Sequence, residues 1–318
     1  MKTRVTELLG IQYPIFQGAM AWISYAPMVA AVSEAGGLGI IGGTIMTPDI
    51  IRKEIRKVRE LTDKPFGVNI ISLSPWIEDI LKVLVEEKVL VATYGTGNPE
   101  KIIEKLKPGG VLSFPVVPTP ETAKRAQDNG ADGVIISGME GGGHVGTLST
   151  MIVVPQARDL VDIPLVAAGG IGDQRGMVAA FALGAEAIQM GTRFICTKEA
   201  YCHDNVKDFI MRSGPRDTLV TGNITGMPVR CLKNTMSKTF MEMESTGKSK
   251  AEMALFGGGK MKQAFQDGDV DDGSVMTGQI CGMIDDVPTT AELIKRMVHG
   301  MGEVLERCQD LLKLDSDD

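Results

Sequence analysis

Short runs of apolar, largely β-branched residues alternate with amphipathic stretches along most of this chain. Runs of the first kind predict β-strands, whereas stretches with apolar positions three and four residues apart predict helices. The pattern predicts eight strands separated by helices. These strands lie at 13–17, 38–41, 66–71, 89–94, 111–116, 133–137, 164–168 and 187–190.

The stretches between the strands have the marks of complete helices. One begins at Pro48, and proline suits the first helical turn because no partner is lost with its missing N–H. Strands that alternate with helices are typical of a parallel sheet, and eight of them favour a closed TIM (β/α)8 barrel. An open, doubly wound sheet is the alternative, since a sequence does not show closure. The helices are predicted at 48–61, 76–87, 99–106, 120–129 and 174–183.

The alternation stops after the eighth strand. Residues 198–273, called the insertion below, are rich in Met, Lys, Glu and Gly and have little strand character. We therefore predict an α/β protein in which residues 1–197 and 274–318 form a TIM barrel. The insertion is expected to form a small, mainly helical lobe that covers the barrel mouth, the end where the strands finish. A last amphipathic helix at 290–312 is expected to complete the ring.

The composition narrows the class of protein. The 33 Lys and Arg stand against 40 Asp and Glu, a net charge of −7 that argues against binding to nucleic acid. Five widely spaced cysteines without a C-x-x-C pair indicate neither a disulfide framework nor a zinc site. The chain shows no apolar signal region and no apolar run long enough to cross a bilayer. We expect a cytoplasmic protein that binds no membrane and has no metal-ligand cluster.

Glycines follow the last two predicted barrel strands. Strand seven leads into Gly169 and Gly170, and strand eight carries Gln189 and leads into Gly191 and Thr192. In TIM barrels the loops after these two strands often bind a phosphate, and backbone N–H groups, a helix N-terminus and a threonine hydroxyl are suitable donors. Tight turns alone would explain Gly169 and Gly170, but two neighbouring glycine-bearing ends favour a monophosphate site.

Small and amide-bearing residues are predicted around the rest of the mouth. Strand one leads into Gly18, Ala19 and Met20, and strand three carries Asn69. Such residues suit a planar heteroaromatic cofactor, and flavin mononucleotide (FMN) combines a planar ring with a monophosphate. No G-x-G-x-x-G follows the first strand, so a Rossmann dinucleotide site is not indicated. Paired carboxylates and histidine clusters are also lacking, which favours redox chemistry over hydrolysis.

A glycine-rich segment with a histidine follows strand six. This histidine loop (residues 138–146) holds His144 among glycines that let the backbone pass close to a flat ligand. An imidazole can donate a proton or a hydrogen bond near neutral pH. The alternative is a structural imidazole that satisfies loop carbonyls. His203 is predicted to share one helical face with Glu199 and Lys207, as part of a surface charge ladder or a lobe-packing contact rather than in catalysis.

Four motifs resemble the nitronate monooxygenase-like family of FMN-dependent TIM barrels. The likeness spans nearly the whole chain, and 278–284 is similar to the FabK-type FMN-dependent enoyl-acyl-carrier-protein reductases within it. Gly142 departs from the family, where alanine is expected, and we expect the lost methyl group to have no consequence. The four motifs are Pro-Ile-Phe-Gln-Gly-Ala-Met at 14–20, Gly-Met-Glu-Gly-Gly-Gly-His at 138–144, Ala-Gly-Gly-Ile at 168–171 and Gln-Met-Gly-Thr-Arg-Phe at 189–194.

The resemblance implies a reaction and a binding site. NADH or NADPH would reduce FMN, which would pass hydride to the β-carbon of a trans-2-enoyl thioester on acyl-carrier protein, while His144 serves as proton or hydrogen-bond donor. It also implies a homodimer and leaves open a monovalent-cation requirement. The implied FMN contacts are Gly18, Ala19 and Met20 with the ring, Asn69 with its polar edge, and Gly169, Gly170, Gln189, Met190, Gly191 and Thr192 at the phosphate end.

Other functions fit parts of the pattern. A nitronate monooxygenase would use the same fold and flavin with oxygen as acceptor, and His144 as the base. A non-catalytic flavin-binding barrel is a second alternative. A barrel of the inosine-monophosphate dehydrogenase type would need a catalytic cysteine, and Cys196 lacks a surrounding motif for it. Lysines of the insertion suit an acidic carrier protein, although lysines also simply solvate helices. They are Lys233, Lys238, Lys248, Lys250, Lys260 and Lys262.

Overall fold

The central feature of the computed structural model, which describes residues 1–95 and 99–312, is a sheet of eight parallel strands. Its strand order is β1-β9-β8-β6-β5-β4-β3-β2. All eight predicted strands are present, each within two residues of its predicted bounds. They are β1 (Ile15–Gln17), β2 (Gly39–Gly42), β3 (Phe66–Ile71), β4 (Val91–Gly95), β5 (Leu112–Val117), β6 (Val134–Ser137), β8 (Leu165–Ala168) and β9 (Ala187–Met190).

The two ends of this strand order meet and close the barrel. Phe16 in β1 forms a parallel bridge with Leu38, which directly precedes β2. The Gln17 amide donates to the Leu38 carbonyl over 3.0 Å, and the Leu38 amide donates to the Ile15 carbonyl over 2.9 Å. The sheet is therefore a TIM barrel, and the open doubly wound alternative is excluded.

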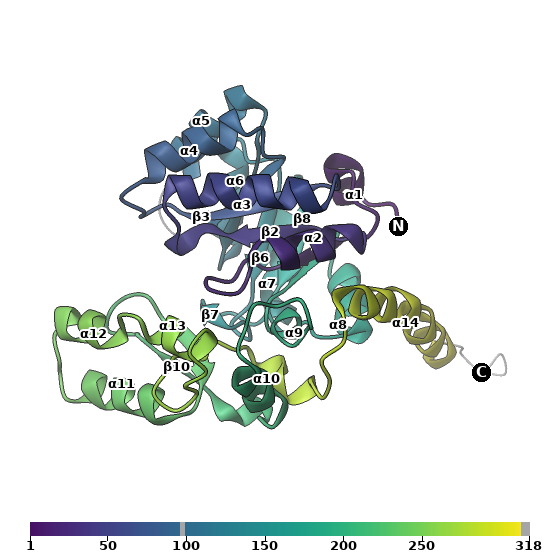
Figure 1. Cartoon of the computed structure of the whole chain (residues 1–318). Helices are drawn as coiled ribbons and strands as arrows, with labels where there is room; N and C mark the ends of the chain where they lie inside the picture. The colour runs from purple at the N-terminus through teal and green to yellow at the C-terminus, as the bar shows by residue number, and fades with distance from the viewer. Residues whose placement is uncertain (96–98, 313–318) are drawn as a thin grey trace.

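Helices surround the strands (Figure 1). The five helices predicted between strands are present, and α14 packs against α2 and α8 to complete the ring as predicted. The sequence analysis did not assign α1, α2 and α7. Residues 313–318 of the predicted barrel segment lie outside the described residues. The helices are α1 (Arg4–Leu9), α2 (Ala26–Glu34), α3 (Pro48–Leu61), α4 (Ile77–Glu86), α5 (Pro99–Leu106), α6 (Pro120–Asp128), α7 (Thr150–Leu160), α8 (Gln174–Ala182) and α14 (Thr290–Leu311).

The barrel interior is filled by side chains. Phe16 and Phe114, which point inward from β1 and β5, are fully buried with ring centroids 6.2 Å apart. Val5 and Leu9 of α1 belong to the same buried cluster, so this first helix closes the end of the barrel opposite the mouth. Since a filled interior leaves no pore, we expect a ligand site at the mouth, where TIM-barrel active sites lie.

The insertion contains strands as well as helices. Figure 1 shows α11, α12 and α13 gathered on one side of the molecule, away from α3 to α6. The hairpin β10–β11 was not predicted, and β7 from the histidine loop joins it in a three-stranded antiparallel sheet. The new elements are β7 (Gly143–His144), α9 (Thr192–Ile195), α10 (Asp204–Met211), η3 (Pro215–Asp217), β10 (Thr218–Thr221), β11 (Val229–Leu232), α11 (Thr235–Ser245), α12 (Lys250–Gly257), α13 (Lys260–Phe265) and η4 (Gln279–Met283), with η1 (Gly43–Ile45) and η2 (Lys107–Gly109) in the barrel.

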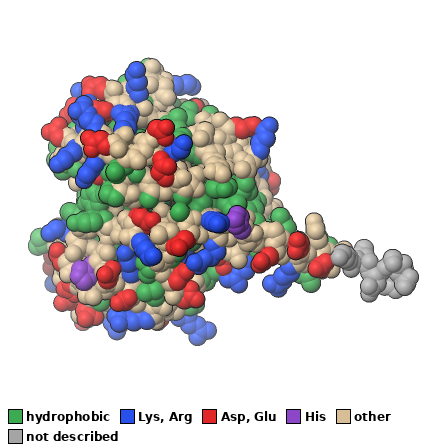
Figure 2. All heavy atoms as spheres, turned by 45° about the vertical axis from the view of Figure 1, so that its right-hand side comes forward, with side chains coloured by type: hydrophobic (Ala, Val, Ile, Leu, Met, Phe, Trp, Pro, Cys, Tyr) green, Lys and Arg blue, Asp and Glu red, His purple; other side chains and the backbone are tan. Residues whose placement is uncertain are grey.

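The surface carries charges of both signs. On the face drawn in Figure 2, acidic and basic side chains are interspersed, and hydrophobic side chains gather between the upper and lower parts of the molecule. Mixed charges of this kind produce no extended positive field on that face. Among the described helices, none combines the length and apolar character needed to span a membrane.

Candidate active site at the barrel mouth

The predicted cofactor-binding residues lie at or directly after the carboxyl ends of β1, β8 and β9, and Asn69 lies in the second half of β3. Because the strands of a parallel barrel finish at the same end, residues far apart in the chain share this mouth. The Gly18 amide donates to the Met190 carbonyl over 2.8 Å. A Cβ at Gly18 would lie 3.3 Å from the Gln189 Cγ, and one at Gly191 would lie 3.8 Å from the Met20 sulfur. These five residues therefore form one continuous surface.

Gln17 fixes the turn that follows β1. Its side chain is fully buried, its Nε2 donates to the Ser24 Oγ over 2.8 Å, and its Oε1 accepts from the Ile40 amide over 3.0 Å. The Ser24 Oγ in turn accepts from the Met20 amide over 3.0 Å. This role of Gln17 was not predicted, although a polar residue at the end of an apolar strand is a signal for it. The network holds Gly18 to Met20 in place from behind.

Asn69 of β3 is hydrogen-bonded to β4 and to the turn that follows β2. Its Nδ2 donates to the Thr93 carbonyl over 3.1 Å and to the Thr93 Oγ1 over 3.0 Å, while its Oδ1 accepts from the Thr44 Oγ1 over 3.3 Å. The amide is half-buried at the mouth. An amide oxygen has two lone pairs, so Asn69 retains acceptor capacity. Its predicted contact with a flavin edge stays a prediction.

The ends of β8 and β9 form the candidate anion cradle. Gly169 and Gly170 have φ of +87° and +71°, the left-handed conformation that favours glycine. A Cβ at Gly169 would lie 2.7 Å from the Gly138 carbonyl oxygen. Within residues 1–95 and 99–312, the amides of Gly170 and Gly191 donate no hydrogen bond. Two unused donors on neighbouring strand ends fit the phosphate of FMN.

Thr192 supplies a third polar group beside this cradle. Its side chain is buried, and its Oγ1 accepts from the Gly278 amide over 2.9 Å. A hydroxyl that accepts in this way keeps its own proton for donation. The sequence analysis identified Thr192 but missed Gly278, which follows the insertion in the chain. The segments that precede and follow the insertion thus meet at the predicted phosphate site.

His144 lies in a strand and its imidazole is exposed. It pairs with Val229 of β11, and the neighbouring Val145 amide donates to the Pro228 carbonyl over 3.1 Å. Surrounding protein desolvates the imidazole and lowers the pKa of His144. No hydrogen bond joins this imidazole to any residue in the described part of the chain. The alternative of a structural imidazole satisfying loop carbonyls therefore finds no support.

Glu140 anchors the middle of the histidine loop. Its Oε2 accepts from the Thr150 amide and the Thr150 hydroxyl, each over 3.0 Å, at the start of α7. A carboxylate at a helix N-terminus satisfies N–H groups that have no partner within the helix. The Glu140 carbonyl accepts from the Gln279 amide over 2.9 Å. The loop is thus tied both to the barrel and to the segment after the insertion.

The glycine at position 142 is required by its neighbours. A Cβ there would lie 2.7 Å from the Gly278 amide nitrogen, and a Cβ at Gly278 would lie 2.7 Å from the Glu140 carbonyl oxygen. Two backbones approach each other at this point with no room for a methyl group. The expectation that the departure from alanine has no consequence is therefore wrong, because Gly142 permits this contact.

Cys196 and His203 lie in environments that indicate structural roles. Cys196 is fully buried, and burial raises the pKa of its thiol to about 12, so it is not a nucleophile near neutral pH. His203 begins α10, where its Nδ1 accepts from the Asn205 amide over 3.1 Å. Glu199 lies outside this helix and accepts from the Thr290 amide. The predicted helical face shared by Glu199, His203 and Lys207 is therefore wrong.

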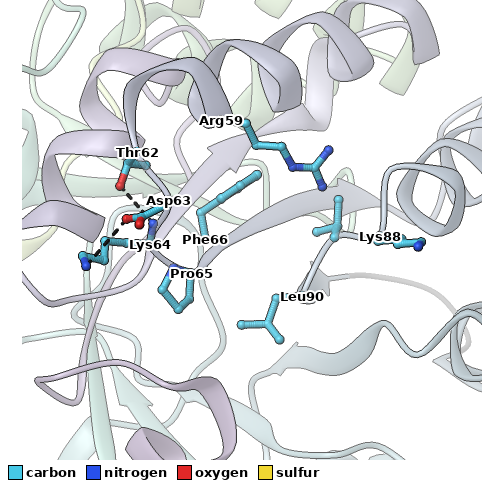
Figure 3. Close-up of a pocket in the computed structure, with 9 residues that line it drawn as sticks. Arg59, Thr62, Asp63, Lys64, Pro65, Phe66, Lys88 and Leu90 are labelled. Carbon is cyan, nitrogen blue, oxygen red and sulfur yellow. Dashed lines mark hydrogen bonds and ion pairs between the residues drawn. The ribbon is translucent and has the colours of Figure 1, made fainter.

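A shallow pocket of about 390 Å³ lies at the opposite end of the barrel. Figure 3 shows Phe66 and Leu90 at its centre, where β3 and β4 begin, with Arg59, Lys64 and Lys88 around them. In TIM barrels this end serves stability rather than chemistry. Among the described residues, no group of three His, Cys, Asp or Glu side chains has the arrangement of a metal site. The mouth is therefore the candidate active site.

Known proteins resemble this protein over nearly its whole length. The model of the family described as "Nitronate monooxygenase" matches residues 2–84 and 72–300. The solved structure of FabK from Thermotoga maritima is 45% identical with a TM-score of 0.96, and the match covers 98% of this chain and 100% of that one.

Two curated relatives extend the comparison. A Rhodococcus jostii protein named (3aS,4S,5R,7aS)-5-hydroxy-7a-methyl-1-oxo-octahydro-1H-indene-4-carboxyl-CoA dehydrogenase is 34% identical, over 94% of this chain and 95% of its own. A probable nitronate monooxygenase from Staphylococcus saprophyticus is 36% identical over 74% of this chain and 79% of its own. The chain belongs to the nitronate monooxygenase family of FMN-dependent oxidoreductases.

Proposed function

We propose that this protein is an FMN-dependent enoyl-acyl-carrier-protein reductase that uses NADH or NADPH. The observation that carries the proposal is the exposed His144 imidazole, which has no hydrogen-bond partner among the described residues and belongs to a loop packed against the glycine-rich strand ends. The likeness to FabK supports it because it covers barrel, insertion and last helix together. When bound, FMN would supply a two-electron carrier that accepts and returns hydride.

Different residues of the mouth would bind the ring and the phosphate of FMN. Gly18 and Met20 would lie against the flavin ring because their turn is held by the buried Gln17 network. The amides of Gly170 and Gly191 would donate to the phosphate. The turn that carries Gly18 and Met20 is held by hydrogen bonds within the protein, and such preorganisation lowers the entropic cost of binding.

His144 would act on the substrate. Hydride addition to the β-carbon of an enoyl thioester moves the C=C electron pair toward the thioester carbonyl, and a proton must then reach the α-carbon. An imidazole near the carbonyl can stabilise the developing negative charge and deliver that proton. The net reaction consumes one enoyl thioester, one NAD(P)H and one proton, and gives the saturated thioester and NAD(P)⁺.

The proposal of a thioester substrate and the proposal of an acidic carrier protein rest on separate observations. The Rhodococcus relative is named for a carboxyl-CoA substrate, and coenzyme A forms the same thioester bond as acyl-carrier protein. In the insertion, Lys238 and Lys250 are exposed and form no ion pair with a described residue, whereas Lys248 pairs with Glu252 and Lys262 pairs with Asp267. Unpaired lysines are suitable contacts for an acidic carrier protein. A homodimer and a cation requirement stay predictions.

Nitronate oxidation is the second candidate, favoured by the family match and by the Staphylococcus relative. A neutral His144 would then serve as the base that deprotonates a nitroalkane, and its lowered pKa suits that task.

Anaerobic flavin spectroscopy separates the two functions. The yellow protein is mixed with NADH or NADPH, bleaching is followed, and crotonyl thioester is then added. Bleaching followed by reoxidation on thioester addition would support the enoyl reductase. Bleaching by a nitronate, with none by either nucleotide, would overturn it in favour of the monooxygenase.

A further inference from the structure

Arg230 is a buried arginine of β11 that touches the histidine loop twice. Its side chain is 5% exposed, and its backbone pairs with Gly143, the residue before His144. Its Nε donates to the Met139 carbonyl over 3.0 Å, near the beginning of the same loop. One residue of the insertion thus contacts the histidine loop at Met139 and at Gly143, the residue directly before the candidate proton donor.

The guanidinium is also fixed within the hairpin. Its Nη1 donates to the Thr218 Oγ1 of β10 over 2.9 Å. The planar fork of an arginine holds several donors in a rigid arrangement, so the Met139 and Thr218 contacts orient one another. A lysine in this place has a single ammonium and lacks that geometry.

The charge of Arg230 has no contacting counter-ion among the described residues. Burial lowers its pKa, while the Glu140 carboxylate, at a longer distance, acts in the opposite direction. A buried cation is costly, and an apolar side chain of similar volume would often be more stable. Stability alone therefore does not account for an arginine here. Charge-assisted hydrogen bonds are shorter and stronger than neutral ones, which suits the task of fixing a loop carbonyl.

We propose that Arg230 is a positioning residue that fixes the histidine loop against the β10–β11 hairpin and thereby sets the place of the His144 imidazole. It acts through the loop backbone and contacts neither substrate nor cofactor. Loss of its side chain removes the hydrogen bond to the Met139 carbonyl, whereas the β7–β11 ladder and the backbone bonds Met139–Leu148 and Gln279–Glu140 persist. The loop then samples several positions instead of one.

Hydrogen exchange on the flavin-loaded protein tests this directly. In Arg230→Ala, amides of residues 138–146 are expected to exchange about tenfold faster or more, the size expected for loss of a charge-assisted bond. Arg216→Ala is the matched control, since Arg216 is an exposed arginine of the same insertion. Guanidinium ion added to Arg230→Ala is expected to restore protection. Unchanged protection of this loop in Arg230→Ala overturns the proposal.

A kinetic measurement rests on the proposed function and distinguishes positioning from general destabilisation. Reoxidation of the reduced protein by crotonyl thioester is expected to slow about 10- to 100-fold in Arg230→Ala, with bleaching by NAD(P)H unchanged. If the wild-type protein does not use the thioester but the loop still loses protection, the function fails and the positioning role stands. Should Arg230→Ala not fold, Arg230→Lys and Arg230→Gln give the same two measurements, and wild-type behaviour in both overturns the role.

Discussion

The backbone amide of Gly278 donates a 2.9 Å hydrogen bond to the hydroxyl of Thr192, a residue 86 positions earlier in the chain. The bond joins the segment that follows the insertion to the end of β9. Because the contact is buried, neither group has water as an alternative partner. Thr192 therefore serves both the returning chain and the predicted phosphate site.

Thr192→Val is expected to weaken FMN binding about tenfold or more. The valine keeps the volume but removes a phosphate donor and leaves the Gly278 amide without an acceptor, a loss of about 1–3 kcal/mol. Fluorescence titration of the deflavinated protein with FMN measures the change. Thr192→Ser retains the hydroxyl and should bind almost as tightly as wild type. Equal affinities for Thr192→Val and wild type would remove Thr192 from the site.

Gly170→Ala is expected to impair the anion cradle. An alanine at φ +71° is strained by about 1–2 kcal/mol, and its Cβ would lie 3.3 Å from the Glu140 Cβ. Gly247→Ala is the control, since Gly247 has φ +74° in open space far from the mouth. Both variants should lose similar stability in urea, but only Gly170→Ala should bind FMN more weakly. Equal FMN affinity in the two variants contradicts the cradle.

Regular elements could be predicted because their periodicity is local. The strands and the capped helices repeat every two or 3.6 residues, so each window of sequence contains its own signal. The helix α7 lacks this clarity because Pro155 stands inside it, and α2 is apolar on most of its positions. The short strand β7 was missed because its two residues become extended only by pairing with β11.

The candidate site was predictable where barrel geometry alone decides it. Once eight βα units are counted, Gly169 and Gly191 must lie at one end, since parallel strands finish together. Arg230 could not be assigned in this way, because its contact with Met139 joins residues 91 positions apart. The requirement for glycine at 142 was likewise invisible, since it depends on the approach of Gly278. Such contacts arise from packing of the insertion, which has no repeating pattern.

The thioester half-reaction is expected to depend on the protonation of His144. Partial desolvation by the surrounding protein lowers the pKa of this exposed imidazole from its ordinary value near 6.5. A proton donor is active in its protonated form, so the reoxidation rate should fall as pH rises through this lowered pKa. His144→Gln keeps a hydrogen-bond donor but cannot titrate, and should lose about 100-fold in rate together with the pH dependence.

Stopped-flow spectroscopy of reduced wild-type protein between pH 5 and 9 measures this dependence, with NAD(P)H bleaching of His144→Gln as the control for folding and flavin binding. A pH profile that persists unchanged in His144→Gln would assign the titration to another group. Retention of full rate by this variant would remove His144 from the reaction.

Glu87 is expected to stabilise the barrel far from the mouth. Its buried carboxylate accepts hydrogen bonds from Arg52, Arg56 and Arg59 of α3. Burial alone would raise the pKa of Glu87, but the hydrogen bonds from Arg56 and Arg52 outweigh it and hold the pKa below its ordinary value. The unfolded chain then binds a proton more readily, so this contribution is present near neutral pH and is lost as pH falls through the lowered pKa.

Glu87→Gln is accordingly expected to lower the free energy of unfolding by about 2 kcal/mol at pH 7, the scale of a charged hydrogen bond. The difference from wild type should shrink toward acid pH, because protonation removes the same charge from wild-type Glu87. Urea unfolding at several pH values measures it, and FMN affinity should stay unchanged because the cluster lies at the other end of β3 and β4. A stability difference independent of pH would show that the lost contacts are not electrostatic.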